Sequence, residues 1–421
     1  MLIRNAEELS ITPDRKFALD ILEKSLLNLN PSRVIERIAK DLPSPGKDSF
    51  FYVYGIGKAS QSLYAGIRNA LSERIKKGII IIPDDEEQGI DFPELLILRG
   101  THPYPSELSV ESTKKLLSDL EKRDKEDLVI FLVSGGGSAL FEIPENGLTV
   151  QDISSITECV MDHGADITEL NAIRILLSRV KGGKTLDHIG SDNVSAFYVS
   201  DVIGNDIRFI ASGPLVRSDF NPDKVVEKFR FCMKKGFVPP QSHGDKTYKK
   251  IQNRIILSNS DFVNFIRHEI GEERCIDLGT EISGNVDQAA ERILGTLRNL
   301  QGRIKETWFA GAGETTVTLK GNGRGGRNQE LCLHVLEKLH EDEDILFISA
   351  GTDGIDGASP AMGGIVDRKT LESTSTDEIR SVIDNNDSYT FLSKHRGSIM
   401  TGRTGNNVSD IMFGRYEVIS S

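Results

Sequence analysis

Five short apolar runs of strand length lie in the first half of the chain, and they constrain the fold more than any other feature. They are FYVYGI (51–56), IIII (79–82), LLIL (95–98), LVIFLV (128–133) and VSAFYV (194–199). Helix-length segments separate several of them. Strands that are buried on both faces lack a polar alternation, so this order predicts a largely parallel sheet with helices on both sides.

The second half alternates in a similar way. It holds CIDLG (275–279), a helical pattern over 285–300, WFAGAGETTVTL (308–319), a helical pattern over 328–340 and ILFISAG (345–351). Near the start, Thr12 and Pro13 precede apolar residues at helical spacing, which predicts a capped helix on the outside of a sheet.

A chain of 421 residues exceeds the size at which one core usually keeps growing, so two α/β domains are expected, with the active site in the cleft between them. The Pro- and Gly-containing segment 236–247 is a candidate linker. We predict domains at 1–240 and 241–421, with a boundary inside 236–285. Strand RIILSN (254–259) is also compatible with completing the first sheet.

The net charge of -12 is spread along the chain, and no basic run interleaves with aromatic residues. Nucleic acid and anionic membranes are therefore not expected as partners. An anionic ligand would need Lys, Arg and backbone N–H groups that converge locally.

Targeting and redox features point to the cytoplasm. The N-terminal segment lacks a signal-peptide pattern, and no apolar stretch reaches 18 residues. Cys159, Cys232, Cys275 and Cys332 lie far apart, so we predict reduced, buried thiols.

Glycine clusters follow two of the strands, at the edge where open α/β sheets bind ligands. GIGKAS (55–60) offers Gly55, Gly57 and Lys58 before a helix, which suits an anion, although a tight turn explains it equally well. A dinucleotide fingerprint would need glycine at Ser60. SGGGSAL (134–140) is a candidate nest for phosphate or carboxylate, formed by Ser134, Gly135, Gly136, Gly137 and Ser138.

The segment SRVKGGKT (178–185) resembles a phosphate-binding P-loop but begins with Ser178 rather than glycine, so we reject that interpretation. Arg174, Lys181 and Lys184 recur at helix-like spacing. They form either a basic helix face for an anion or a solvated face.

Carboxylates stand at the ends of three further strands. Asp201, Glu314 and the pair Asp353 and Asp356 are oxygen ligands of the kind that Mg²⁺ prefers, although each alone fits a turn. Arginines in glycine-rich segments, at the start of expected helices, suit phosphate. These segments are NGRGGRNQE (322–330), with Arg324 and Arg327, and TGRTGNN (401–407), with Arg403, Thr404, Asn406 and Asn407.

Ten strings, in order, resemble the glycerate 2-kinase family whose C-terminal half is the MOFRL domain. They are GIGKAS, THPYP (101–105), SGGGSAL, NAIRILLSRVKGGK (171–184), YVSDVIGND (198–206), ASGPLV (211–216), GAGETTV (311–317), GRGGRNQE (323–330), AGTDGIDG (350–357) and TGRTGNN. The resemblance implies a Rossmann-like N-terminal domain, a second α/β domain with a mixed sheet, and ATP-dependent phosphorylation of D-glycerate to 2-phosphoglycerate. It also implies that Lys58 and Arg327 are functional and places Asp201, Glu314, Asp353 and Asn407 at the site.

The resulting hypothesis is a kinase that uses ATP and Mg²⁺, without nucleic acid or membrane partners and with the oligomeric state open, a homodimer included. Lys58, Arg327 and Asp201 are the candidate catalytic residues, and Glu314 and Asp353 the candidate metal ligands. The candidate residues for ATP, phosphate or substrate are Gly55, Gly57, Ser134, Gly135, Gly136, Gly137, Ser138, Arg174, Lys181, Gly311, Gly313 and Asn407. The alternatives are a nicotinamide-dependent 2-hydroxy-acid oxidoreductase and a non-enzymatic sugar-phosphate-binding regulator.

Overall fold

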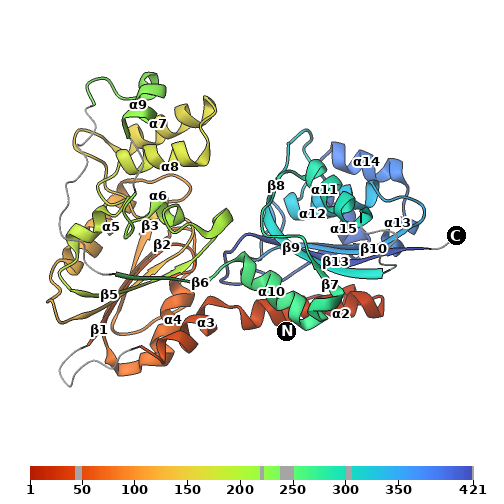
Figure 1. Cartoon of the computed structure of the whole chain (residues 1–421), viewed down its shortest axis with the longest axis horizontal. Coiled ribbons are helices and arrows are strands. Elements are labelled where there is room, and N and C mark those ends of the chain that lie inside the picture. Colours follow the sequence, from red (N-terminus) through yellow and green to blue (C-terminus); the bar gives the residue numbers. More distant parts are fainter. Residues whose placement is uncertain (43–49, 219–221, 238–250, 300–305, 420–421) are drawn as a thin grey trace. The chain divides into compact units, whose positions relative to one another are not determined.

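The computed structural model describes residues 1–42, 50–218, 222–237, 251–299 and 306–419. Its contacts divide the chain into two units (Figure 1). We call Pro31–Ile256 the N-terminal unit, and Met1–Asn30 together with Leu257–Ser421 the C-terminal unit. These units differ from the predicted domains 1–240 and 241–421, because the first thirty residues belong with the C-terminal unit. The division after Ile256 lies inside the predicted range 236–285. The candidate linker from 238 onward lies outside the described residues, and the cleft between domains stays a prediction.

The N-terminal unit holds one sheet of six strands in the order β3-β2-β1-β4-β5-β6. Its strands are β1 (Phe51–Ile56), β2 (Ile75–Pro83), β3 (Leu95–Gly100), β4 (Leu128–Val133), β5 (Asn193–Val199) and β6 (Ile251–Leu257). Pairings among β1 to β5 are all parallel, as predicted. The strand predicted near 254 is β6, which completes this sheet.

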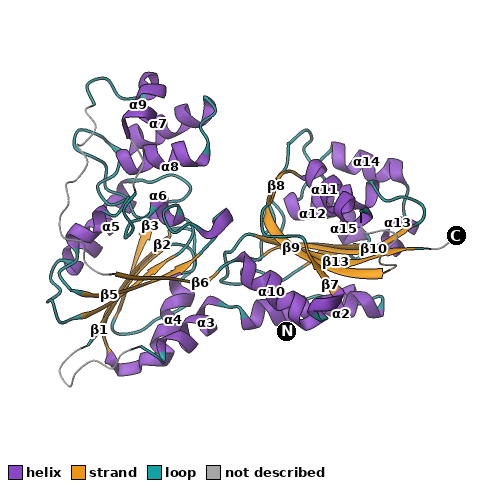
Figure 2. Ribbon diagram, viewed as in Figure 1, coloured by secondary structure: helices purple, strands orange, loops and turns teal. Residues whose placement is uncertain are grey.

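Helices cover both faces of that sheet (Figure 2). The α-helices are α3 (Pro31–Ala39), α4 (Ser60–Leu71), α5 (Glu107–Leu120), α6 (Gly137–Leu140), α7 (Val150–Asp162), α8 (Ile167–Leu176) and α9 (Pro222–Lys228). The 3₁₀ helices are η1 (Ser72–Arg74), η2 (Lys184–His188), η3 (Ile203–Asn205), η4 (Ile210–Ser212) and η5 (Arg230–Cys232). Tyr54 and Ile56 share a buried apolar cluster with Leu116 of α5 and Leu140 of α6, while α4 packs on the opposite face.

The C-terminal unit holds a mixed sheet in the order β12-β11-β10-β13-β9-β7, with β8 paired to β9. Its strands are β7 (Cys275–Asp277), β8 (Ile282–Asn285), β9 (Glu306–Thr316), β10 (Glu343–Gly351), β11 (Gly363–Asp367), β12 (Ser398–Ile399) and β13 (Asp410–Val418). β13 runs antiparallel to both β9 and β10. The predicted mixed sheet is confirmed.

One face of this sheet carries a helical layer whose side chains form a single apolar cluster with the strands (Figure 1). The helices of the unit are α1 (Ala6–Leu9), α2 (Pro13–Asn28), α10 (Asn259–Ile270), η6 (Glu272–Arg274), α11 (Val286–Arg298), α12 (Arg327–Glu337), α13 (Arg368–Glu372), α14 (Thr376–Asp384) and α15 (Ser388–Lys394). Leu294 of α11, Leu331 of α12 and Phe391 of α15 pack there with Phe347 of β10. α12 therefore lies firmly against the strands that carry the candidate residues.

A buried arginine explains why the N-terminal residues belong to the C-terminal unit. Arg15 of α2 is fully buried and donates from Nε and Nη2 to the carboxylate of Asp367, at 2.8 Å each. It also donates to the carbonyl oxygen of Arg396 at 2.6 Å. The predicted cap is confirmed, since the hydroxyl of Thr12 accepts from the backbone N–H of Arg15.

The cysteine prediction is wrong for two residues. Cys159 of α7 and Cys232 of η5 form a disulfide with their Cα atoms 5.7 Å apart. They meet because Phe229, close to η5, packs into the apolar cluster of α7 and α8, a tertiary contact that sequence spacing does not reveal. Cys275 and Cys332 are free and buried, as predicted. Within the described residues, no helix has the length and apolarity needed to span a membrane.

Candidate active site

The glycine loops after β1 and β4 lie against each other, because these neighbouring parallel strands end in register. Ile56 pairs with Val133, and the loops that follow are hydrogen-bonded. The backbone N–H of Lys58 donates to the carbonyl oxygen of Gly135 at 3.0 Å, and the N–H of Ala59 donates to the Ser134 hydroxyl at 3.0 Å. The two predicted motifs therefore form one structure.

Close packing accounts for the two glycines of the first loop. Gly57 has a φ of +111°, and a Cβ there would stand 2.4 Å from Ser134 Oγ. A Cβ on Gly55 would stand 2.9 Å from Ile80 Cγ2. Both glycines allow the loops to approach, so they shape the site rather than supply a ligand contact by themselves.

Lys58 lies over the glycine loop together with a histidine that the sequence analysis did not select. A Cβ on Gly136 would stand 3.3 Å from both Lys58 Cγ and His102 Cδ2. Among the bonds of the described residues, none has the backbone N–H of Gly135 or Gly136 as its donor. These N–H groups and the Lys58 ammonium are hydrogen-bond donors of the kind that suits an anion.

His102 is kept neutral by its surroundings. Burial, together with the positive charges of Lys58 and Arg174, lowers the pKa of His102 to about 4, although part of the residue remains open to solvent. A neutral imidazole beside two cations can donate or accept a hydrogen bond without adding charge. In the sequence, His102 belongs to the THPYP string. That string supported the family resemblance, but nothing in it indicated a chemical role for the histidine.

The basic helix face predicted from Arg174, Lys181 and Lys184 does not exist. α8 ends at Leu176, and Lys184 begins the separate helix η2. Lys181 is buried in an ion pair with Glu142, and Lys184 donates to the carbonyl oxygen of Ile175 at 2.9 Å. Of these three residues, Arg174 is the one whose charge acts on His102.

Asp201 lies beyond β5, the strand next to β4. It therefore lies at the same edge of the sheet as the glycine loop that follows β4. A strained segment from ASGPLV adjoins that loop. Ala211 and Ser212 have positive φ values of 51° and 58°, and the hydroxyls of Ser212 and Ser138 lie 2.8 Å apart. Strain of this kind clusters at functional sites, and sequence alone did not mark Ser212.

In the C-terminal unit, strand topology gathers the acidic residues. β13 begins between the ends of β9 and β10, where Asp410 pairs with Gly313 on one side and Gly351 on the other. A Cβ on Gly351 would stand 3.3 Å from Asp353 Oδ1 and 3.5 Å from Asp410 Oδ1. Asp410, which the sequence analysis missed, is fully buried at the centre of this group.

Arg327, at the start of α12, joins this group through three hydrogen bonds. Its Nε donates to Asp410 Oδ2 at 2.6 Å, its Nη2 to Asp410 Oδ1 at 3.0 Å and its Nη1 to Glu314 Oε1 at 2.8 Å. Burial opposes the charge of the guanidinium, but Asp410 and Glu314 outweigh it and raise the pKa of Arg327. The arginine is therefore a fixed cation with part of its surface exposed.

The same group could hold a hard cation. Glu314 has a half-exposed side chain and lies near the end of β9, two residues before its last residue, as predicted. Asp353 follows β10 in the turn beside Asp410. Carboxylate oxygens from neighbouring strands fit Mg²⁺, which prefers oxygen ligands.

Asp356 has a structural role instead. It is buried and accepts from the backbone N–H groups of Asn328 at 3.0 Å and Gln329 at 2.9 Å, in the first turn of α12. Burial raises the pKa of Asp356, while these bonds lower it. Asp356 thus caps the helix that begins with Arg327, which satisfies N–H groups that the helix cannot pair itself.

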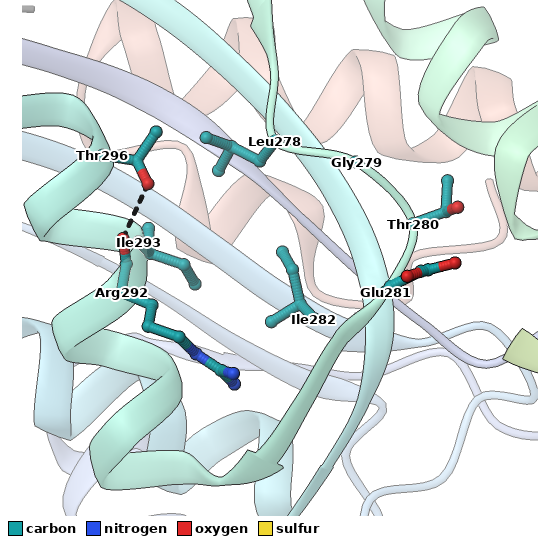
Figure 3. A pocket seen from close by; sticks show the side chains of 8 residues that line it. All are labelled: Leu278, Gly279, Thr280, Glu281, Ile282, Arg292, Ile293 and Thr296. Atoms are coloured by element: carbon teal, nitrogen blue, oxygen red, sulfur yellow. Dashed lines mark hydrogen bonds between the residues drawn. The ribbon is translucent and has the colours of Figure 1, made fainter.

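Gly311 and Gly313 allow close packing against β8 and the loop that precedes it. A Cβ on Gly313 would stand 1.9 Å from the carbonyl oxygen of Ile282, and one on Gly311 would stand 2.9 Å from Leu278 Cβ. That loop, Ile282 of β8 and α11 line an open cavity of about 550 Å³ (Figure 3). Arg292 and Ile293 lie on the α11 side of this cavity.

The segment TGRTGNN begins no helix, contrary to the prediction, and leads instead into β13. The apolar alternation after Asp410 favours a strand, which explains the difference. Asn407 is partly buried there. Its neighbour Asn406 is buried, and both polar atoms of its side chain lack hydrogen-bond partners within the described residues. A bound ligand or water would satisfy them.

Comparisons with known proteins show which family the chain belongs to. Residues 17–235 match a domain of unknown function (DUF4147), and residues 307–410 match the MOFRL family. A glycerate 2-kinase from Picrophilus torridus is 40% identical over 418 residues, which cover 99% of each chain. The chain belongs to the glycerate kinase family. The D-glycerate 2-kinase of Thermotoga maritima is 32% identical and covers 95% of this chain and 98% of its own.

The chain also shares the fold of a solved glycerate kinase structure. The crystal structure of glycerate kinase from Thermotoga maritima superposes with a TM-score of 0.83 at 29% identity and covers 96% of this chain and 99% of its own. The resemblance stated from the ten strings is thereby confirmed.

Proposed function

We propose that this chain is an ATP-dependent glycerate 2-kinase, which transfers the γ-phosphoryl group of ATP to the 2-hydroxyl of D-glycerate. The observation that carries the proposal is the group formed by Arg327, Asp410 and Glu314 at one sheet edge. Full-length similarity to glycerate 2-kinases supports the choice of substrate. Because ATP is the phosphoryl donor, we expect the enzyme to work in the cytoplasm.

In this reaction the 2-hydroxyl oxygen of glycerate forms a bond to the γ-phosphorus. The bond from that phosphorus to the β,γ-bridging oxygen breaks, and ADP leaves with its electron pair. Asp201 is our candidate for accepting the hydroxyl proton. Phosphoryl transfer depends mainly on positioning and on stabilising negative charge, so the cations near the loops carry most of the catalysis.

Lys58, Arg174 and the N–H groups of Gly135 and Gly136 would bind anionic groups of ATP or glycerate. The neutral His102 would orient one of these groups by a hydrogen bond. Arg327, held rigid by Asp410, would stabilise the transferring phosphoryl group, because a guanidinium matches phosphate oxygens with two parallel bonds.

Mg²⁺ would be held by Glu314 and Asp353, and when bound it would neutralise the charge of the ATP phosphates. Asp410 is less suited to the ion, because both of its oxygens accept hydrogen bonds from Arg327. Its role would be to fix the guanidinium.

The test is incubation of the protein with ATP, Mg²⁺ and D-glycerate, followed by ³¹P NMR identification of the product. We expect 2-phosphoglycerate and ADP, with no product when L-glycerate replaces the substrate or EDTA removes the metal. A change in NADH with 2-hydroxy acids and no ADP would instead favour the oxidoreductase. Binding of sugar phosphates without turnover would favour the regulator.

A further inference from the structure

A histidine and two carboxylates converge in the C-terminal unit, away from the candidate active site. His334 and Glu337 lie three residues apart on α12 and so share one face, and Asp287 lies in the first turn of α11. His334 Nδ1 is 3.4 Å from Asp287 Oδ1 and 3.6 Å from Glu337 Oε2. One ligand atom from each of the three lies within 4.8 Å of the others.

These separations are too long for good hydrogen bonds, whose donor–acceptor distances cluster near 2.9 Å. They are close to the spacing of about 3.3 Å between two ligands of a tetrahedral ion bound at about 2.0 to 2.1 Å. His334 is only 7% exposed, and its Nδ1 is buried without a hydrogen-bond partner in the part of the chain that the structure describes. A buried ring nitrogen in this state needs an explanation.

Two cations orient the carboxylates, Lys338 through the Asp287 oxygen that also faces His334, and Arg380 through the Glu337 oxygen that does not. Lys338 Nζ lies 2.8 Å from Asp287 Oδ1, and Arg380 Nε lies 2.9 Å from Glu337 Oε1. Glu337 is thus held through one oxygen while the other faces the histidine ring. Outer contacts of this kind orient the ligands of metal sites and raise affinity.

All three side chains also line a cavity of about 450 Å³ between α11, α12 and α14. An ion held by them would therefore keep an open position for water. Burial lowers the pKa of His334, which favours the neutral imidazole that binds metals.

We propose that Asp287, His334 and Glu337 form a binding site for a first-row transition metal ion such as Zn²⁺, which joins α11 to α12. One imidazole and two carboxylates suit Zn²⁺ or Co²⁺ rather than Mg²⁺ or Ca²⁺, which prefer oxygen ligands alone. The site is separate from the glycerate kinase chemistry, since none of its ligands belongs to the group around Arg327 and Asp410.

The experiment measures metal binding directly. The full chain, with its disulfide oxidised and with millimolar Mg²⁺ present to occupy oxygen-only sites, is titrated with Co²⁺ by visible absorption and with Zn²⁺ by calorimetry. The variants are His334→Ala and Glu337→Gln, and the matched control is His268→Ala, an exposed histidine on α10 of the same unit. His163→Ala tests the histidine beside the disulfide, and thermal melts in EDTA verify that each variant folds.

We expect one equivalent of Co²⁺ with a d–d band, a rise in Tm with Zn²⁺, and affinity at least about tenfold weaker in Glu337→Gln. His334→Ala should lose the band, while His268→Ala and His163→Ala should match the wild type. The proposal is overturned if the wild-type chain binds no metal, or if the folded Glu337→Gln and His334→Ala variants bind as tightly as the controls. In that event the three residues form only an ion-pair cluster.

Discussion

Arg327 donates to both carboxylate oxygens of Asp410, from Nε at 2.6 Å and from Nη2 at 3.0 Å. The arginine begins α12 and the aspartate begins β13, so the pair joins a helix to the centre of the sheet. A lysine has no planar fork and could not make this double contact. The pair therefore fixes where the remaining donors of Arg327 point.

Replacing Arg327 by alanine should collapse turnover with only a modest loss of ATP affinity. An arginine at a transferring phosphoryl group contributes on the order of 10³-fold or more in rate. Steady-state kinetics should show this fall in kcat, and Arg327→Lys should recover little of it. Arg324→Ala is the matched control, because Arg324 lies in the loop just before α12, where its guanidinium stands 5.0 Å from the centroid of the Tyr389 ring. Wild-type turnover in Arg327→Ala would remove this residue from the mechanism.

Substitution should show that Lys58 serves substrate binding and Lys181 serves stability. Lys58→Met should greatly weaken substrate use, measured as kcat/KM, with little change in chemical denaturation, because Lys58 is partly exposed beside the glycine loop. Lys181→Met breaks a fully buried pair with Glu142 and should cost about 3 to 5 kcal/mol.

The double variant Lys181→Met with Glu142→Leu serves as the control for that contrast. It removes both buried charges, so it should recover most of the lost stability. If the double variant unfolds as readily as the single one, the ion pair does not explain the loss.

Much of the fold was predictable because strands and glycine loops have local signals. The apolar runs that became β1 to β5 and the glycine loop after β4 can be recognised within ten residues of sequence. Arg327 at the start of a helix was also predictable, since α12 begins where the glycine-rich segment ends.

Other features depend on residues far apart, which sequence patterns do not connect. Asp410 was missed because its importance comes from β13 entering between β9 and β10. Lys181 was misassigned because its partner Glu142 lies 39 residues earlier. The disulfide joins cysteines 73 residues apart, and nothing near Cys159 in sequence indicates Cys232.

That disulfide should stabilise the helical region around α7. In the chain-entropy model, closing a loop of 73 residues is worth about 4 kcal/mol, and measured values are typically about 2 to 4 kcal/mol. The variant Cys159→Ser with Cys232→Ser should therefore unfold at lower denaturant concentration, and a reducing agent should destabilise the wild-type chain but not this variant. The control is Cys275→Ser, which replaces a free buried cysteine. This variant keeps the disulfide, so a reducing agent should destabilise it as it does the wild type.

Glu343 should make stability depend on pH in the acid range. Burial alone would raise its pKa, but bonds from Arg298, the His340 N–H and the Tyr416 hydroxyl outweigh burial and lower the pKa to about 2. Since this lies below the usual value of 4.5, the stabilisation is complete above about pH 4.5 and disappears as the pH falls toward 2. At about 1.4 kcal/mol per pH unit across that window, the contribution is about 3 kcal/mol. The free energies of unfolding in urea of Glu343→Gln and the wild type should differ by this amount at pH 7 and converge toward pH 2. A difference that does not change with pH would show that packing, not charge, is responsible.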